Sequence, residues 1–282
     1  RWSVHHHHQL DAGGAGGLSM IGIGYPSLLS ASSTVSGGDW LTALPASNIL
    51  TTALEDVARS ADDLEASTLL QIDHGSAQSA RVLALVHHNL SSAATVRWKR
   101  GTTAGDDDVA DSGALNAWAI TPLDRNGQRH PVVIVLPASS SARYETIQIS
   151  DTSNPAGHVE IGMAWVGDVF VPTYNASYGL RHELQSFSAL DRGESAAGWP
   201  TRRRTLRGAS FVLELLSLTE GDTLHELQRV ADITEPVLYV PDLTDRAKQQ
   251  RFGGVGTLSE LSPLDYPYFR TNSLPLRWTE LA

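Results

Sequence analysis

The sequence predicts a mainly β protein, in which a β-sandwich precedes a second β-rich domain with one packed α-helix. Short apolar runs bounded by turn-forming residues are typical of strands that are buried on both faces. Other segments alternate between apolar and polar residues, which is the period of a half-buried strand. Proline and glycine recur at intervals of about ten residues, a spacing typical of sandwiches and barrels.

The first half contains clear strand signals. Residues 81–86 and 132–136 are apolar runs between turn-forming residues. In residues 95–99, Val96 and Trp98 lie on one face of the expected strand and basic residues lie on the other. Because one face is apolar, this strand is expected to be half-buried, with Trp98 in the core.

Residues 47–60 are expected to hold a first helix. Its apolar residues lie near helical spacing; they are Ile49, Leu50, Leu54 and Val57. Further along, residues 159–165 alternate and predict a half-buried strand, and residues 208–218 predict a long strand. The alternating apolar residues are Val159, Ile161, Met163 and Trp165.

A second helix is predicted over residues 222–232, before Pro236 opens a strand at residues 237–240. Thr223 and Glu226 have the spacing of a capping box. Four residues form an apolar stripe: Leu224, Leu227, Val230 and Ala231. This stripe is expected to pack onto the preceding strand through Phe211, Leu213 and Leu215.

The chain is expected to divide near residues 151–157, where polar and turn-forming residues separate two strands. This gives a sandwich over residues 20–155 and a second domain over residues 156–282. Residues 1–19 are rich in glycine and histidine, and we interpret them as a flexible arm.

Composition limits the classes of partner. The 282 residues carry a formal charge of −10, which argues against nucleic acid or an anionic membrane as the main partner. Charged residues make up only 18%, so the surface is expected either to be rich in Ser, Thr, Asn and Gly or to be covered by neighbouring subunits, and composition leaves both open. Cysteine is absent, which excludes a disulfide framework and thiolate sites.

No motif of an enzyme or a metal site is complete. Residues 106–108 with Asp111 form an acidic loop that lacks the EF-hand spacing, so a solvated loop is preferred over a calcium site. His87 and His88 are adjacent on an expected strand and point to opposite faces, which disfavours a shared metal. We therefore expect no catalytic residues, no metal and no cofactor.

The arginines between residues 202 and 207 form the one basic cluster. On a strand, Arg202 and Arg204 would share one face, and Arg203 and Arg207 the other. Two interpretations stay open: a solvated edge that deters sheet pairing, or a contact with an acidic neighbouring subunit.

Residues 70–98 resemble the galactose-binding-like (discoidin-like) domain of bacteriophage tail proteins, with Asp73, Gly75 and Asn89 in its frame. Residues 44–48 and the pair Arg59-Ser60 match the same family. The resemblance implies a jelly-roll sandwich. Where the family carries a tryptophan before the Arg-Ser pair, this chain has Val57-Ala58, which weakens the sugar pocket that the family would imply.

The second half is similar to the distal-tail and tail-tube-like domains of the same phage proteins, in residues 161–172, 204–215 and 236–241. This resemblance implies a structural component of a phage tail tip, a distal tail or baseplate protein that joins the tail tube to the baseplate or fibres. It implies a homo-oligomeric ring, expected to be a hexamer, with tube, baseplate hub and fibre proteins as partners. The protein would reside in the virion after assembly in the host cytoplasm.

An alternative is a carbohydrate-binding module that recognises a host surface glycan through loops of the sandwich. Sugar sites use a flat aromatic face with flanking polar groups. Trp40 and Trp118 are the loop aromatics that fit this chemistry, and Arg202 and Arg204 are further candidates for ligand or subunit contacts.

Overall fold

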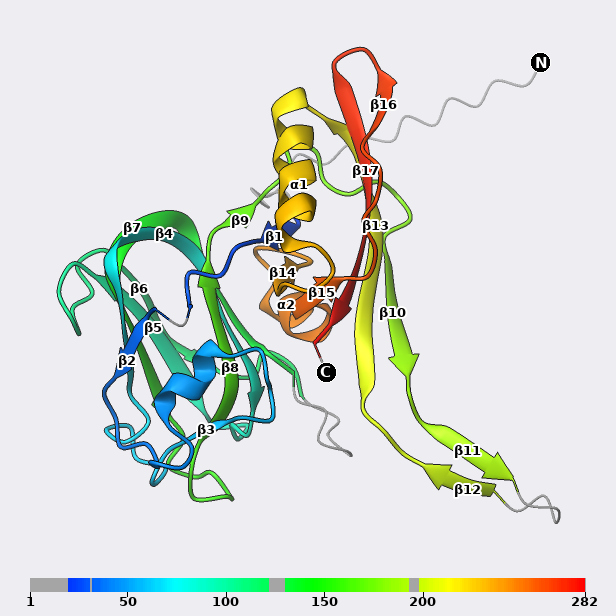
Figure 1. Ribbon diagram of the computed structural model, residues 1–282. Coiled ribbons are helices and arrows are strands. Elements are labelled where there is room, and N and C mark those ends of the chain that lie inside the picture. Colours follow the sequence, from blue (N-terminus) through cyan, green and yellow to red (C-terminus); the bar gives the residue numbers. More distant parts are fainter. Residues whose placement is uncertain (1–19, 31, 122–129, 193–197, 282) are drawn as a thin grey trace, which may run out of the picture.

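The computed structural model describes residues 20–30, 32–121, 130–192 and 198–281 (Figure 1). The fold is mainly β and built of antiparallel sheets, which confirms the predicted fold class. The predicted arm at residues 1–19 lies outside the described residues. Neither of the two α-helices in the described residues is long and apolar enough to span a membrane.

The first body is a sandwich made by one sheet that folds over on itself. Its strand order is β3-β8-β4-β7-β5-β6, with β2 paired to β4. Strands β4 and β7 have 19 residues each and pair with each other along most of their length. The register of this pairing shifts along the strands. The strand bounds are β2 Thr34–Ser36, β3 Ala58–Arg59, β4 Leu70–His88, β5 Thr95–Gly101, β6 Ala110–Asn116, β7 Val132–Ser150 and β8 Glu160–Gly167.

The apolar runs at residues 81–86 and 132–136 lie in β4 and β7, as predicted. Val96 and Trp98 of β5 are fully buried in the sandwich core, which confirms the inward face of this strand. Trp98 also donates its indole N–H to the buried Glu145, 2.8 Å away, so its polar atom is satisfied inside the core.

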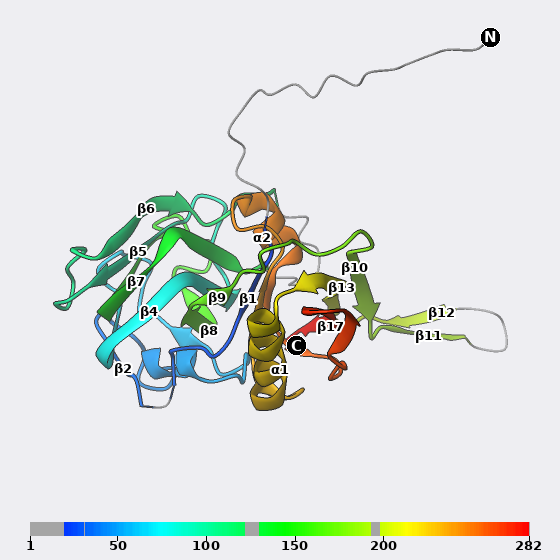
Figure 2. The same cartoon turned by 90° about the horizontal axis from the view of Figure 1, so that it is seen from above.

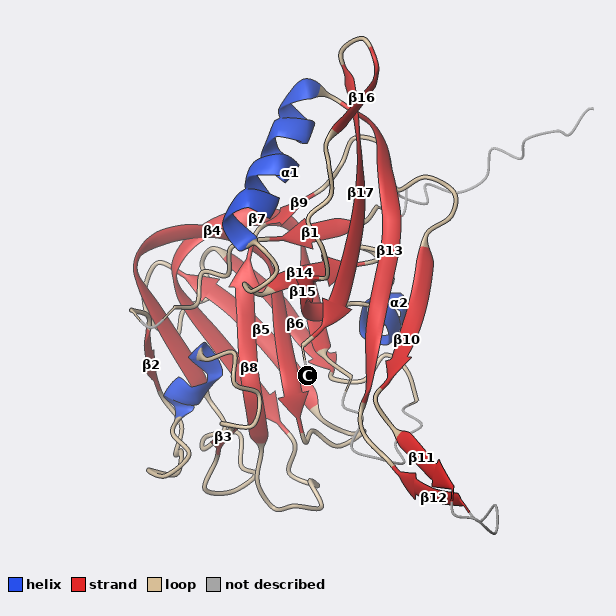
Figure 3. Cartoon of the chain, turned by 45° about the vertical axis from the view of Figure 1, so that its right-hand side comes forward, coloured by secondary structure: helices blue, strands red, loops and turns tan. Residues whose placement is uncertain are grey.

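The second body is a sheet of order β10-β13-β17-β15-β14-β1-β9, with β16 paired to β17. Helix α1 packs on this sheet, and the ribbon β11–β12 extends from β10 and β13 (Figure 3). The bounds are β1 Gly22–Gly24, β9 Val169–Phe170, β10 Arg181–Ser186, β11 Ala189–Arg192, β12 Gly198–Thr201, β13 Thr205–Leu216, α1 Leu218–Ala231, β14 Val237–Val240, α2 Arg246–Phe252, β15 Gly254–Leu258, β16 Asp265–Tyr268 and β17 Thr271–Glu280.

The two bodies lie side by side (Figure 2) and share a buried apolar cluster. Met163 and Trp165 of β8 pack in it with Leu238 and Val240 of β14. The alternation in residues 159–165 predicted a half-buried strand, but β8 is buried almost throughout. The difference arises because the second sheet covers the face of β8 that a lone sandwich would expose.

The sheets cross the predicted division at residues 151–157. Strand β8 follows that segment but pairs with β3 and β4 of the first sheet. Strand β1 precedes the sandwich but pairs with β14 and β9 of the second sheet. At Gly24 a side-chain Cβ would lie 2.5 Å from the ring of Trp165, so only glycine allows this close approach.

The predicted first helix is wrong. Residues 47–60 hold no α-helix but a 3-10 turn, η1 Ala46–Leu50, and the short strand β3. The side-chain amide of Asn48 donates a hydrogen bond to the backbone carbonyl of Val57, which holds the chain in a loop. Ile49 and Leu54 are buried in two different clusters rather than on one helical face, so their spacing imitates a helix without one.

Helix α1 begins four residues before the predicted residue 222, at Leu218. Its capping box uses Ser217 and Glu220, not Thr223 and Glu226. Thr223 donates instead to the carbonyl of Thr219. The predicted capping box is therefore wrong, and the N-cap of α1 lies upstream of Thr223, at Ser217.

The apolar stripe of α1 is narrower than predicted. Leu224, Leu227 and Ala231 are buried, whereas Val230 is 46% exposed. On the sheet, Phe211 and Leu213 join the same cluster as the helix. Leu215 does not: it has a positive φ of 57° in an irregular part of the β13–β17 pairing, and Leu216 is buried in its place.

A matched pair on α1 tests this packing. We expect Leu224→Ala to lower the free energy of unfolding by about 2–5 kcal/mol, because it leaves a cavity against the sheet. Val230→Ala should change it by less than about 1 kcal/mol, because this side chain is half-exposed. Chemical denaturation followed by circular dichroism measures both, and equal losses would contradict the assigned buried face.

Candidate functional site

The two predicted loop tryptophans are half-buried and bonded within the sandwich. The indole N–H of Trp40 donates to the carbonyl of Leu69 at 3.2 Å. That of Trp118 donates to the carbonyl of Leu90, also at 3.2 Å. In the described part of the sandwich no aromatic side chain is classed as exposed. Ligand contacts by these two tryptophans stay a prediction.

The arginine cluster does not divide between two strand faces. Residues 202–204 precede β13, so strand alternation does not govern them. Arg202 and Arg203 are exposed. Arg204 and Arg207, which were expected on opposite faces, instead converge on one carboxylate, that of Glu280.

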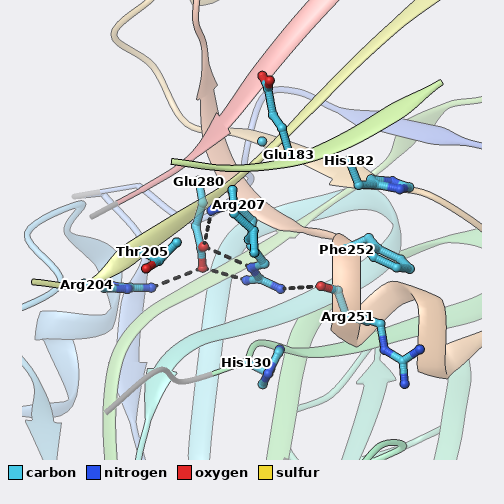
Figure 4. A pocket seen from close by; sticks show the side chains of 11 residues that line it. His130, His182, Glu183, Arg204, Thr205, Arg207, Arg251, Phe252 and Glu280 are labelled. Atoms are coloured by element: carbon cyan, nitrogen blue, oxygen red, sulfur yellow. Dashed lines mark hydrogen bonds and ion pairs between the residues drawn. The ribbon is translucent and has the colours of Figure 1, made fainter. Parts of the chain in front are cut away.

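This carboxylate lies beside a cavity of about 390 Å³, which we call the β10–α2 pocket (Figure 4). Strands β10, β13 and β17 form one side, helix α2 forms another, and His130 is contributed from the segment before β7. The lining residues are His130, His182, Glu183, Leu184, Arg204, Thr205, Arg207, Gly208, Arg251, Phe252 and Glu280.

Glu280 is buried and doubly paired. Its side chain is 4% exposed, and Arg207 binds it through Nη2 at 2.6 Å and Nε at 3.0 Å. Arg204 adds a contact at 3.1 Å. Burial acts to raise the pKa of Glu280, but the hydrogen bonds and charge of Arg207, with the charge of Arg204, outweigh burial and leave this pKa below its ordinary value.

Arg207 also holds the end of α2. Its Nη1 donates to the carbonyl of Gln250 at 3.0 Å and to that of Arg251 at 3.4 Å. These are carbonyls of the last helical turn, which have no partner within a helix and carry its negative dipole end. The Arg207 guanidinium group therefore connects α2 to β13 and β17 and fixes the shape of the pocket.

An aromatic pair forms the other side of the pocket. The rings of His182 and Phe252 stack with centroids 4.2 Å apart and an angle of 14° between their planes. Nε2 of His182 lies 3.3 Å from the hydroxyl of Tyr239. Burial lowers the pKa of His182, so the imidazole is neutral at pH 7.

His130 adds a second neutral imidazole. Burial, followed by the positive charge of Arg207, lowers its pKa. Nδ1 lies 3.1 Å from the carbonyl of Gln250 and must donate to it, which leaves Nε2 of the neutral ring as an acceptor. The pocket thus combines an aromatic pair, arginine donors and an imidazole acceptor.

The other polar clusters have structural partners. Asp108 accepts hydrogen bonds from Thr102, and Asp111 pairs with Arg97, so the acidic loop joins β5 to β6 as predicted. His88 is buried and accepts from the amide of Leu90. Within the described ranges, no group of three or more histidine and acidic side chains is placed to hold a metal ion.

Sequence patterns pointed to two residues of the pocket lining, Arg204 and Arg207, which both belong to the basic cluster. His182, Arg251, Phe252 and Glu280 were missed because they come from separate segments that meet only in the folded sheet. Their local sequences carry no motif. The only usable signal was the basic cluster in an acidic chain.

No protein-family model matches the chain, and no curated protein matches it. Among solved structures, a family 32 carbohydrate-binding module from a family 31 glycoside hydrolase of Clostridium perfringens is 11% identical, with a TM-score of 0.37; the match covers 50% of this chain and 96% of that one. The family 32 module of NanJ from C. perfringens, in complex with galactose, is 12% identical, with the same coverages and TM-score. The lectin domain of lectinolysin with Lewis b antigen is 11% identical, with coverages of 54% and 98% and a TM-score of 0.35.

The buried pair at Glu280 leads to a pH prediction. Because the pKa of Glu280 is lowered in the folded state, its stabilisation is full at neutral pH and is lost as pH falls through the folded pKa. We expect Glu280→Gln to lower the free energy of unfolding by about 3–5 kcal/mol at pH 7, because Arg207 is left without its buried partner. The difference should shrink toward acidic pH.

Glu226→Gln is the control, since Glu226 pairs with Arg229 at an exposed position. It should have a much smaller effect at neutral pH than Glu280→Gln. Urea denaturation at several pH values measures both variants. A Glu280→Gln defect that is small at pH 7, or that grows as pH falls, would contradict the assigned pair.

Proposed function

We propose that the protein is a glycan-binding protein and that the sugar binds in the β10–α2 pocket. The observation that carries this proposal is the stacked pair of His182 and Phe252 beside the arginine donors of the pocket. Aromatic faces pack against the C–H groups of sugar rings, and polar groups around them bind hydroxyls. The β10–α2 pocket offers both kinds of group.

The polar groups suit hydroxyl recognition. Arg204 and Arg251 are donors, Nε2 of His130 is an acceptor, and Thr205 can act as either. Binding of this kind needs no nucleophile or metal, and so we propose a binding protein rather than an enzyme.

A glycan array with the full chain tests this function. We expect hits that weaken by about tenfold in His182→Ala, since the variant removes one ring of the stacked pair. Trp40→Phe and Trp118→Phe are controls, because these side chains lie outside the pocket lining and should keep the same hits. Hits that survive in His182→Ala but disappear in the tryptophan variants would place the site in the sandwich loops instead.

A second candidate function is that of a structural subunit which assembles with copies of itself. The observation that favours it is a group of exposed apolar residues on β10 and on the ribbon β11–β12, and this ribbon projects beyond the rest of the molecule (Figures 1 and 3). Its exposed apolar residues are Leu184, Phe187, Leu190 and Trp199. Large apolar side chains that are exposed in one region are typical of protein interfaces.

Strand β10 lies at the end of its sheet and pairs there with β13 only, so its outer edge is available for strand addition. Arg202 and Arg203 are exposed nearby, and within the described residues neither pairs with a carboxylate. A second copy of a chain with a net charge of −10 supplies the complementary acidic surface. We propose a homo-oligomeric ring, six-fold by the resemblance to phage distal tail proteins, with a place in the virion tail tip.

Size-exclusion chromatography with light scattering tests the assembly. We expect the native chain to elute as an oligomer of the 30.3 kDa subunit and Leu190→Ser with Trp199→Ser to elute as a monomer. Leu64→Ser is a matched control, since Leu64 is as exposed as Leu190 but lies in the sandwich. A native chain that stays monomeric at high concentration would argue against a subunit of a ring.

A further inference from the structure

We infer, building on the glycan binding proposed above, that the β10–α2 pocket selects acidic sugars and that Arg251 binds the sugar carboxylate. The ligand class is a hexuronate or a similar sugar ring that carries one carboxylate. The inference rests on the charge of the lining, on which arginines are already occupied, and on the aromatic pair next to the remaining arginine.

The pocket is a positive region in an acidic protein. Three arginines and two glutamates line it, whereas the whole chain has a net charge of −10. Both histidines of the lining are neutral at pH 7 because burial lowers their pKa. One of the two glutamates, Glu183, points away from the arginines (Figure 4). An anion entering the pocket therefore meets a positive field.

The second glutamate, Glu280, is neutralised by Arg207. All three nitrogens of the Arg207 guanidinium group have partners: Nε and Nη2 bind Glu280, and Nη1 binds two carbonyls of α2. This guanidinium has little donor capacity left for a ligand. Arg207 is therefore a positioning residue, which holds α2 in place and keeps Glu280 from repelling an anion.

Among the residues that the structure describes, none accepts a hydrogen bond from the Arg251 side chain. It is exposed, and among the residues that the structure describes no carboxylate lies within ion-pair distance of it. Its guanidinium carbon lies 6.0 Å from the ring centroid of Phe252. Guanidinium groups bind carboxylates through two parallel hydrogen bonds, a geometry that Arg251 can offer to a ligand.

The neighbouring aromatic pair favours a sugar over a simple anion. Figure 4 shows Phe252 between His182 and Arg251, so aromatic surface and cation adjoin each other. A ligand that combines a sugar ring with one carboxylate can contact both the aromatic pair and the Arg251 guanidinium. Arg204, on the other side of His130 in the same view, binds Glu280 through Nη2 and keeps further donors for the next sugar of a longer chain.

Matched probes test the inference on the full chain by NMR titration. The probes are methyl β-D-glucuronide, methyl β-D-glucoside and acetate, which separate the carboxylated ring from the neutral ring and from the free anion. We expect the glucuronide to bind at least about tenfold more tightly than either of the others. Its affinity should fall by about tenfold in Arg251→Gln and should also fall as salt is raised.

Arg270→Gln is the control. Arg270 is exposed in the turn between β16 and β17, and its substitution changes the net charge by the same amount as Arg251→Gln. It should bind the glucuronide as the native chain does. Equal affinity for glucuronide and glucoside would overturn the acidic selection while leaving glycan binding in place. Equal affinity for glucuronide and acetate would overturn glycan binding and leave an anion site. No shift with any probe would overturn both.

Discussion

The buried ion pair of Arg207 and Glu280 is the interaction on which the pocket depends. A carboxylate that is 4% exposed is costly unless it is paired, and Arg207 supplies that pairing from the neighbouring strand. The same guanidinium holds the final carbonyls of α2. Three elements, β13, β17 and α2, thus meet at one charge pair. The junction also positions the other lining residues. Arg204 pairs with Glu280, and Arg251 and Phe252 are the last two residues of α2.

The pocket also depends on how the two bodies pack. Trp165 of β8 lies in an apolar cluster with Leu238 and Val240 of the second sheet, and Gly24 allows β1 to approach its ring. The side chain of Gln250 in α2 bonds backbone groups of the sandwich at Ala117 and Ala119. These contacts bring His130, which follows the sandwich strand β6 in sequence, to a pocket formed mainly by the second sheet (Figure 4). Neither body alone would contain the complete lining.

Much of the fold was predictable from local patterns, because strand periodicity and apolar runs report burial directly. Trp98 in the core and the strand at residues 237–240 are examples. Local patterns failed where a distant part of the chain buries a residue. The second sheet covers β8, and Ile49 and Leu54 pack into different clusters. Of the candidate site, sequence patterns pointed only to Arg204 and Arg207 of the basic cluster. Arg204 and Arg207 pair with Glu280, which is more than seventy residues away in the sequence. This pairing follows from strand register in the sheet, and the alternation of residues 202–207 cannot reveal that register.

The most direct test of a preformed, glycan-binding pocket is a crystal structure of the full chain with a hexuronate oligosaccharide. The account predicts a sugar ring against His182 and Phe252, its carboxylate on Arg251, and an unchanged pair of Arg207 and Glu280. Sugar bound at the sandwich loops near Trp40 or Trp118, with the pocket free of ligand, would contradict it.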